Sequence, residues 1–142
     1  MIPQWLSLEG LYSYQAPVTI DFRPLTAARL FGIFGSVGSG KSTILEAMTL
    51  ALYGESARLN RNDNRSSNLL NLRSDRLAVD FRFLNRDGDT YRFTVEIKRR
   101  RKNPEEAGTM SRSAYRLDAG SDEWVPLDHV DGERVLGLSY QN

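Results

Sequence analysis

Apolar and polar residues alternate most regularly in the middle of the chain. Large apolar side chains occupy every second position over residues 79–83 and again over residues 91–97, with charged or polar residues between them. Because successive side chains of a strand point to opposite faces, this alternation predicts two strands that share one buried face. Asp87-Gly88 between them supplies turn chemistry, so the sequence predicts a β-hairpin.

A second, weaker hairpin is expected over residues 114–118 and 123–127, with its turn at 119–121. Residues 98–112, between the two hairpins, show no such alternation and are predicted to form an exposed excursion. The two hairpins together define a predicted β subdomain over about residues 77–127.

Three further strands are expected on the N-terminal side. Residues 4–9 alternate loosely, and residues 18–22 alternate cleanly until Pro24 ends the pattern. Residues 30–34 form a short, continuously apolar run of the kind found in buried strands of parallel sheets.

Helical periodicity follows over residues 41–53. The apolar positions repeat at i, i+4, i+7 and i+8, which predicts an amphipathic helix with Gly54 as its C-cap; these positions are Ile44, Met48, Ala51 and Leu52. A second, short helix is expected over Asp131 to Leu138.

The segment over residues 55–76 is polar and has no clear period, so we expect a long loop with a short helical piece near Asn68–Leu72. Its arginines could serve a nucleotide, a partner or only solubility, and solvation is the default expectation for Arg58, Arg61, Arg65, Arg73 and Arg76.

The motif that organises these elements lies just before the main helix. Residues 35–42 fit G-x-x-x-x-G-K-[ST], the phosphate-binding P-loop, without a mismatch. Its glycines allow the backbone N–H groups to turn inward around a polyphosphate, where a Cβ would obstruct the approach. The helix that starts here adds the partial positive charge of its N-terminus. The motif, with an apolar run before it and a helix after it, predicts binding of a nucleoside triphosphate.

Each position of the motif receives an expected role. Lys41 places a positive charge on the β- and γ-phosphates and is the catalytic candidate, while the Ser42 hydroxyl is the expected Mg²⁺ ligand. The residues expected to bind ATP are Gly35, Ser36, Val37, Gly38, Ser39, Gly40, Lys41, Ser42 and Thr43.

Composition limits the remaining possibilities. The 142 residues suffice for one domain, and 40% hydrophobic with 26% charged residues is ordinary for a soluble globular protein. The chain has no cysteine, which excludes a disulfide framework and a thiolate metal site. Neither a signal peptide nor an apolar stretch long enough to cross a bilayer is present, so we expect a cytoplasmic protein without membrane contact.

The net charge of +1 is unevenly distributed. Residues 58–102 carry thirteen basic and six acidic side chains, whereas residues 103–142 carry three basic and eight acidic ones. A basic middle in a nearly neutral chain favours a localised anionic partner over general binding of polyanions.

A complete hydrolytic site is not recognisable. P-loop ATPases hold Mg²⁺ and orient water with an acidic residue at the end of an apolar strand. The Asp122-Glu123 pair instead follows Ala119-Gly120-Ser121 and predicts a turn, and the single histidine, His129, is expected to be a surface residue. The missing groups are therefore expected from further sequence or another chain, and the chain looks cut at Asn142.

Four segments resemble one family, the N-terminal part of SbcC-type ATPases, bacterial relatives of the Rad-fifty DNA double-strand-break repair protein. They are Leu6-Ser7-Leu8-Glu9-Gly10-Leu11-Tyr12-Ser13-Tyr14, Ile20-Asp21-Phe22, Leu30 to Gly35 with Ser39 to Thr43, and Leu45 to Gly54. They lie between residues 6 and 54, and the strand and helix segments are more diagnostic than the P-loop, which many families share.

The resemblance implies an α/β fold: the N-terminal lobe of an ABC-type ATPase head, with the antiparallel β subdomain beside the P-loop core. In this family a long chain folds back through a coiled coil, so residues 1–142 would pair with the chain's own C-terminal half. Two heads then sandwich ATP and Mg²⁺ in a homodimer that acts with an SbcD/Mre-eleven-type nuclease on double-stranded DNA. The signature motif, the Walker B carboxylates and the switch histidine belong to the C-terminal half.

Two positions depart from the family pattern. Gln141 stands in Ser139-Tyr140-Gln141-Asn142, whereas the family's Q-loop glutamine lies in an apolar Leu-Pro-Gln-Gly segment, so that role is not carried over. Val37 occupies a variable position of the motif where many relatives have Asn, Thr or Pro.

The basic run Lys98–Lys102 matches no family feature at the level of single residues. Five consecutive cations suggest contact with duplex phosphates, because phosphate neutralisation dominates DNA affinity. The alternative is a solvated hairpin end, which is the more common role of charge runs.

Two other functions compete with the DNA-repair ATPase. A transporter-type ABC nucleotide-binding domain is disfavoured, because more than 80 residues follow Gly54 without a Q-loop. A P-loop switch protein that does not act on DNA is the other alternative. A GTPase among these would need Asn-Lys-x-Asp after an apolar strand, and Asn60-Arg61-Asn62-Asp63 lacks both the lysine and the strand.

Overall fold

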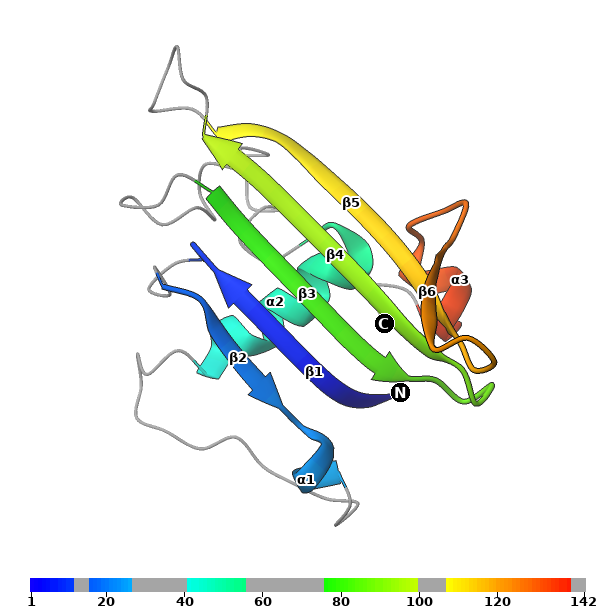
Figure 1. Cartoon of the computed structure of the whole chain (residues 1–142). Helices are drawn as coiled ribbons and strands as arrows, with labels where there is room; N and C mark the ends of the chain where they lie inside the picture. Colours follow the sequence, from blue (N-terminus) through cyan, green and yellow to red (C-terminus); the bar gives the residue numbers. More distant parts are fainter. Residues whose placement is uncertain (12–15, 27–40, 56–75, 100–106, 139–142) are drawn as a thin grey trace.

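The computed structural model describes residues 1–11, 16–26, 41–55, 76–99 and 107–138. In this part of the chain, six strands form one antiparallel sheet in the order β2-β1-β3-β4-β5-β6, and helix α2 lies across one face (Figure 1). The elements are β1 (Ile2–Glu9), β2 (Val18–Asp21), α1 (Arg23–Thr26), α2 (Lys41–Tyr53), β3 (Arg76–Leu84), β4 (Thr90–Arg99), β5 (Ala107–Asp118), β6 (Glu123–Pro126) and α3 (Gly132–Leu136).

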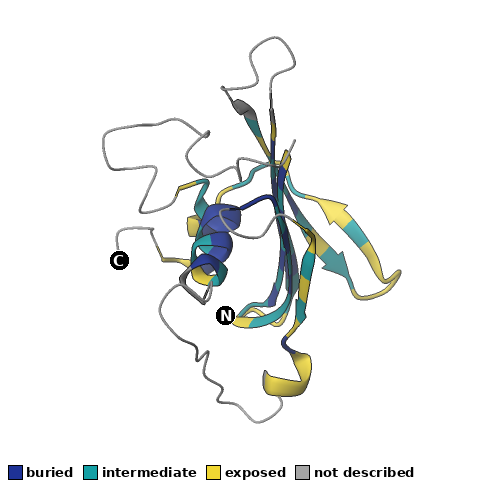
Figure 2. Cartoon of the chain, turned by 90° about the vertical axis from the view of Figure 1, so that its left-hand side faces the viewer, coloured by how far each residue is buried: buried dark blue, intermediate teal, exposed yellow. Residues whose placement is uncertain are grey.

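The core lies between the sheet and α2 (Figure 2). The alternating apolar positions of β1, β3 and β4 all point to this inner face, and they are almost completely buried: Leu6, Leu8, Leu77, Val79, Phe81, Phe83, Tyr91, Phe93, Val95 and Ile97. The ring of Phe83 lies 5.4–5.9 Å from the rings of three neighbours, centroid to centroid. Burial of this apolar surface is the main force that holds the helix on the sheet.

The predicted β-hairpin is confirmed as β3–β4. Phe81 pairs with Phe93, so the apolar residues of both strands share one face. The turn is closed by the Asn85 N–H, which donates to the Asp89 carbonyl at 2.9 Å, and Gly88 has a φ of +86°. A positive φ is readily adopted by glycine, which explains the Asp-Gly signal in the sequence.

The first two predicted strands are also confirmed. β1 pairs with β2 and begins two residues earlier than expected, at Ile2. β2 ends at Asp21 and not at Phe22, whose buried side chain enters the core while its N–H donates to the Gln4 carbonyl.

The predicted excursion over residues 98–112 is wrong at both of its ends, and its central residues 100–106 lie outside the described part of the chain. β4 extends to Arg99 and β5 already begins at Ala107, with Ile97 paired to Met110 and Val95 to Arg112. The two expected hairpins are therefore consecutive parts of one antiparallel meander. Alternation is missing from this stretch of sequence because Ser111 and Ser113 occupy one face of β5 while the inward position between them is an arginine.

The second hairpin, β5–β6, is confirmed near its predicted position. Asp122 adopts a φ of +56° in the turn, and β6 ends at Pro126, one residue earlier than expected. Because β6 is the edge strand and proline has no N–H to donate, Pro126 ends the strand without interrupting the sheet.

The helices predicted over residues 41–53 and 131–138 are confirmed as α2 and α3, whereas the short α1 was not predicted. On α2, Met48, Ala51 and Leu52 are buried and Ile44 is partly buried, and Gly54 closes the helix with a φ of +71°. α3 is shorter than predicted, because Gly137 takes a left-handed conformation and stops it; its N-cap is Asp131, whose carboxylate accepts from two backbone N–H groups.

The predicted strand at 30–34, the helical piece near 68–72 and most of the long loop lie outside the described residues. Among the helices that the structure describes, none is both long and apolar enough to cross a membrane.

Candidate functional site

The candidate site is the N-terminal end of α2. Residues 35–40 of the P-loop motif lie outside the described part of the chain, and α2 begins at Lys41, the lysine of the motif. Ser42 follows in the first turn, and Thr43 is buried at 6% exposure. The helix predicted to follow the motif is therefore present, with the motif's last two residues in its first turn.

The first turn of α2 is suited to a bound anion. It contains no acidic side chain, and the helix has 13 residues whose peptide dipoles leave partial positive charge at this end. The residues present therefore fit a phosphate group, which is the chemistry that the motif requires.

The opposite end of α2 is held by Arg112 from β5. Its Nη2 donates to the carbonyls of Ala51, Leu52 and Val130 at 3.1, 2.8 and 2.9 Å. Burial lowers the pKa of Arg112, and the carboxylates of Asp131 and Glu55 oppose that shift. A hollow of about 280 Å³ borders the contact and is lined by Leu52, Tyr53, Glu55, Arg112, Val130, Asp131, Gly132 and Glu133.

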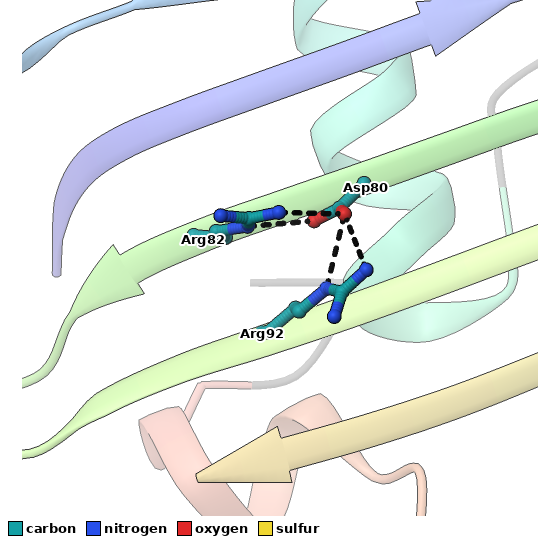
Figure 3. A network of polar contacts seen from close by, with 3 residues as sticks. All are labelled: Asp80, Arg82 and Arg92. Carbon is teal, nitrogen blue, oxygen red and sulfur yellow. Dashed lines mark hydrogen bonds and ion pairs between the residues drawn. The ribbon is translucent and has the colours of Figure 1, made fainter. Parts of the chain in front are cut away.

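A second polar cluster lies on the outer face of the sheet, away from α2 (Figure 3). Asp80 and Arg82 come from β3 and Arg92 comes from β4. The Asp80 carboxylate accepts from Nε and Nη2 of Arg82, both at 3.2 Å, and from Nε of Arg92 at 3.0 Å. Nη2 of Arg92 lies 2.8 Å from the same carboxylate.

Aromatic rings cover these two guanidinium groups. The Arg82 Cζ lies 5.3 Å from the centroid of Trp5 and 5.6 Å from that of Trp124. The Arg92 Cζ lies 5.4 Å from Tyr115 and 5.9 Å from Trp124. Because both guanidinium groups are stacked and share a carboxylate, they stabilise the outer face and are poorly placed to contact phosphates.

The basic run is only partly within the described residues. Lys98 lies near the end of β4 with 72% of its side chain exposed, and its Nζ is 3.4 Å from the Glu96 carboxylate. Residues 100–102 lie outside the described part, so the DNA contact at Lys98–Lys102 stays a prediction.

His129 is more buried than predicted. Its side chain is 21% exposed, and its Nδ1 accepts the Asp131 N–H at 3.3 Å. This hydrogen bond joins the ring to the N-cap residue of α3. Among the described residues no three His, Cys, Asp or Glu side chains are grouped to hold a metal, and Asp122 lies in the turn that the sequence predicted.

Arg112 and the Asp80 cluster were not found from the sequence. Asp80 and Arg82 are two residues apart on one strand, but Arg92 and Arg112 reach their partners only when separate segments pack together. The pairing of Arg82 with Arg92 needs the β3–β4 register, and the contact of Arg112 with Leu52 joins residues sixty positions apart.

Comparison with known proteins supplies the family. A family model described as "AAA domain" matches residues 6–124. The SbcC polypeptide of the SbcCD nuclease from Bacillus subtilis is 46% identical over 96 residues, covering 68% of this chain and 8% of that protein. The corresponding SbcC polypeptide from Clostridium acetobutylicum is 41% identical over 145 residues, covering 98% of this chain and 12% of that protein.

A relative that matches over a shorter stretch is the "Probable DNA double-strand break repair Rad50 ATPase" of Aquifex aeolicus, 44% identical over 55 residues, covering 39% of this chain and 5% of that protein. The chain thus spans about an eighth or less of the length of these relatives. Membership of the AAA domain family implies nucleotide binding, in agreement with the P-loop motif. The family model covers most of the chain, and the two of these relatives that match most of the chain are SbcC polypeptides. The chain therefore belongs to the AAA domain family in its SbcC-type form.

Proposed function

We propose that this chain is the ATP-binding half of a DNA-repair ATPase head. The observation that carries the proposal is the P-loop motif at 35–42, which leads directly into the first turn of a helix anchored on a sheet. The names of the SbcC-type relatives support the DNA-repair setting.

The proposed roles follow the motif. The backbone N–H groups of Gly35, Ser36, Val37, Gly38, Ser39 and Gly40 would surround the phosphates. Lys41 would neutralise the β- and γ-phosphates, Ser42 would bind Mg²⁺, and Thr43 would complete the first turn of the helix. ATP with Mg²⁺ supplies the phosphoryl group to be transferred, and this half of the site binds and orients it.

The remaining catalytic groups are proposed to come from elsewhere. Residues 1–142 would form the N-terminal half of an ABC-type head, completed by the protein's own C-terminal half and by a second head in a homodimer. Engagement of two heads around ATP, followed by hydrolysis, would regulate a nuclease of the SbcD/Mre-eleven type on double-stranded DNA. The relatives' names support this, since they place these proteins in the SbcCD nuclease and in double-strand break repair.

The test is nucleotide binding and turnover by this chain, with and without the C-terminal half of an SbcC-type head as a second chain. We expect binding of Mg–ATP by the chain and turnover only after complementation. Lys41→Ala should weaken ATP binding by about tenfold or more, because it removes the charge that meets the β- and γ-phosphates.

Lys98→Ala is the matched control, because it removes one exposed lysine outside the motif. Equal ATP affinity in Lys41→Ala and Lys98→Ala would contradict the proposal. Rapid turnover by this chain alone would contradict the division of the site between two halves.

A further inference from the structure

The end of α2 opposite the proposed phosphate site is bound to the sheet by one guanidinium group. Nη2 of Arg112 shares its hydrogens among the carbonyls of Ala51, Leu52 and Val130, all within 3.1 Å. The first two are carbonyls of the last turn of α2, which have no partner within the helix. A cation at this end also interacts favourably with the helix dipole. Arg112 is therefore the C-terminal anchor of α2.

Two glycines leave room for this anchor. A Cβ on Gly54 would lie 3.0 Å from Nη1 and 3.1 Å from Cδ of Arg112, and Gly54 also has a φ of +71°. A Cβ on Gly132 would overlap the Leu52 carbonyl oxygen that Arg112 binds. The backbone thus approaches the guanidinium closely at Gly54, and at Gly132 it approaches the α2 carbonyl that the guanidinium binds.

One donor of Arg112 has no hydrogen-bond partner among the described residues. This donor is Nε, which is buried. A buried donor without a partner is unfavourable, so the position of this side chain is imposed by its other contacts. These contacts join β5, the last turn of α2 and the segment before α3.

Apolar packing alone would not fix α2 along its own axis. Most of the contact between α2 and the sheet is apolar and therefore non-directional. Hydrogen bonds from Arg112 are directional, and the Tyr53 hydroxyl adds another by donating to the Leu138 carbonyl at 2.9 Å. Since a helix of 13 residues is a stiff rod about 20 Å long, fixing one end constrains the other.

We propose that Arg112 is a positioning residue for the phosphate site: by anchoring the C-terminal end of α2, it sets the axial position at which Lys41 and Ser42 meet the nucleotide. The inference rests on the proposed function, because it acts on the same P-loop. It adds a residue that lies at the far end of the helix and touches no nucleotide.

The test compares three variants of this chain in the complemented form described above. Arg112→Met removes the hydrogen bonds, Arg112→Lys retains a cation that can reach the carbonyls, and Arg116→Met removes an exposed arginine of the same strand. Two quantities are measured in each: the Kd for Mg–ATP, and hydrogen exchange of the α2 backbone amides without nucleotide.

We expect the Kd of Arg112→Met to rise about tenfold, with Arg112→Lys closer to the unchanged protein and Arg116→Met equal to it. Exchange should increase in Arg112→Met along α2, including the amides of residues 43–47 next to the phosphate site. Gly132→Ala, which displaces the Leu52 carbonyl from the side of α3, should give the same pattern if Arg112→Met does not fold.

Two results would overturn the inference. One is a Kd that stays within about twofold of the unchanged protein in Arg112→Met. The other is increased exchange limited to the last turn of α2, which would make Arg112 a local cap only. Failure of the unchanged protein to bind ATP would refute the proposed function instead, while the exchange measurement, which needs no nucleotide, would still test the anchor.

Discussion

Asp80 links two neighbouring strands on the outer face of the sheet. Its carboxylate accepts from two guanidinium groups on neighbouring strands. Arg82 lies over Trp5 of β1 and Trp124 of β6, and Arg92 lies over Tyr115 of β5 and the same Trp124. The carboxylate side chain is only 19% exposed, so its contacts with the guanidinium groups are partly shielded from water. Removing the charge at this one position would leave two cations without their shared partner.

Asp80→Asn is therefore expected to lower the free energy of unfolding by about 1–3 kcal/mol, since it weakens charge-assisted bonds to two partly buried arginines. Urea denaturation would measure it. Asp89→Asn is the control, because Asp89 is exposed and its carboxylate is 3.9 Å from Arg116, and it should change stability by less than about 1 kcal/mol. Equal losses in the two variants would contradict the role of the Asp80 cluster.

Tyr91 makes stability depend on alkaline pH. Burial, together with the 2.7 Å hydrogen bond that its hydroxyl donates to Asp87, raises the pKa of Tyr91 to about 12. The unfolded chain has the ordinary tyrosine pKa of about 10, so above that pH it loses this proton while the folded protein retains it. The stabilisation by Tyr91 is complete below pH of about 10 and is lost as pH rises towards about 12.

Urea denaturation between pH 8 and 12 would check this pH dependence, with pH 12 chosen as the folded pKa of Tyr91. Tyr91→Phe should lose less stability over that interval than the unchanged protein, because phenylalanine has no proton to release. If the two proteins lost stability in parallel, the titration of Tyr91 would not be the cause.

At the scale of elements, the ends of several strands and helices are set by single residues. β2 ends before the proline of α1, α3 runs from the Asp131 cap to Gly137, and α2 stops at Gly54. The strand β5, in contrast, is not explained by its own sequence. Its first half has no alternating signal and forms because β4 offers it a hydrogen-bonding edge, with Arg112 at an inward position where an apolar residue would be expected. Pairing with a neighbour, not local propensity, makes it a strand.

A glycine comparison tests the junction between β5 and α2. Gly54 and Gly88 have similar positive φ values, +71° and +86°, but a Cβ would meet Arg112 only at Gly54 and nothing within 4 Å at Gly88. Both alanine variants should lose about 1 kcal/mol for the backbone conformation, and Gly54→Ala should lose more because Arg112 must shift. Thermal or urea unfolding of the two variants would measure the difference. An equal or larger loss in Gly88→Ala would show that the Arg112 contact adds nothing.

At the scale of the whole molecule, the described part is a sheet with two unlike faces. The inner face is apolar and is covered by α2. The outer face carries arginines, carboxylates and aromatic rings that contact one another. On α2, Leu45 points away from the core and is 59% exposed. A single exposed leucine of this kind is ordinary on a protein surface and needs no partner to explain it.

The sequence by itself determined the elements whose signals are local. Alternation over 79–83 and 91–97, the period of α2, the Asp-Gly turn and the P-loop motif each depend on neighbouring residues, and they identified the hairpin, the helix and the family. The structure alone decided how distant residues meet: the strand order, the first half of β5, the Asp80 cluster and the Arg112 anchor. The alternation of charged residues on β3 and β4 shows which face they occupy, but their partners are set by the register of the sheet and by where α2 lies across it.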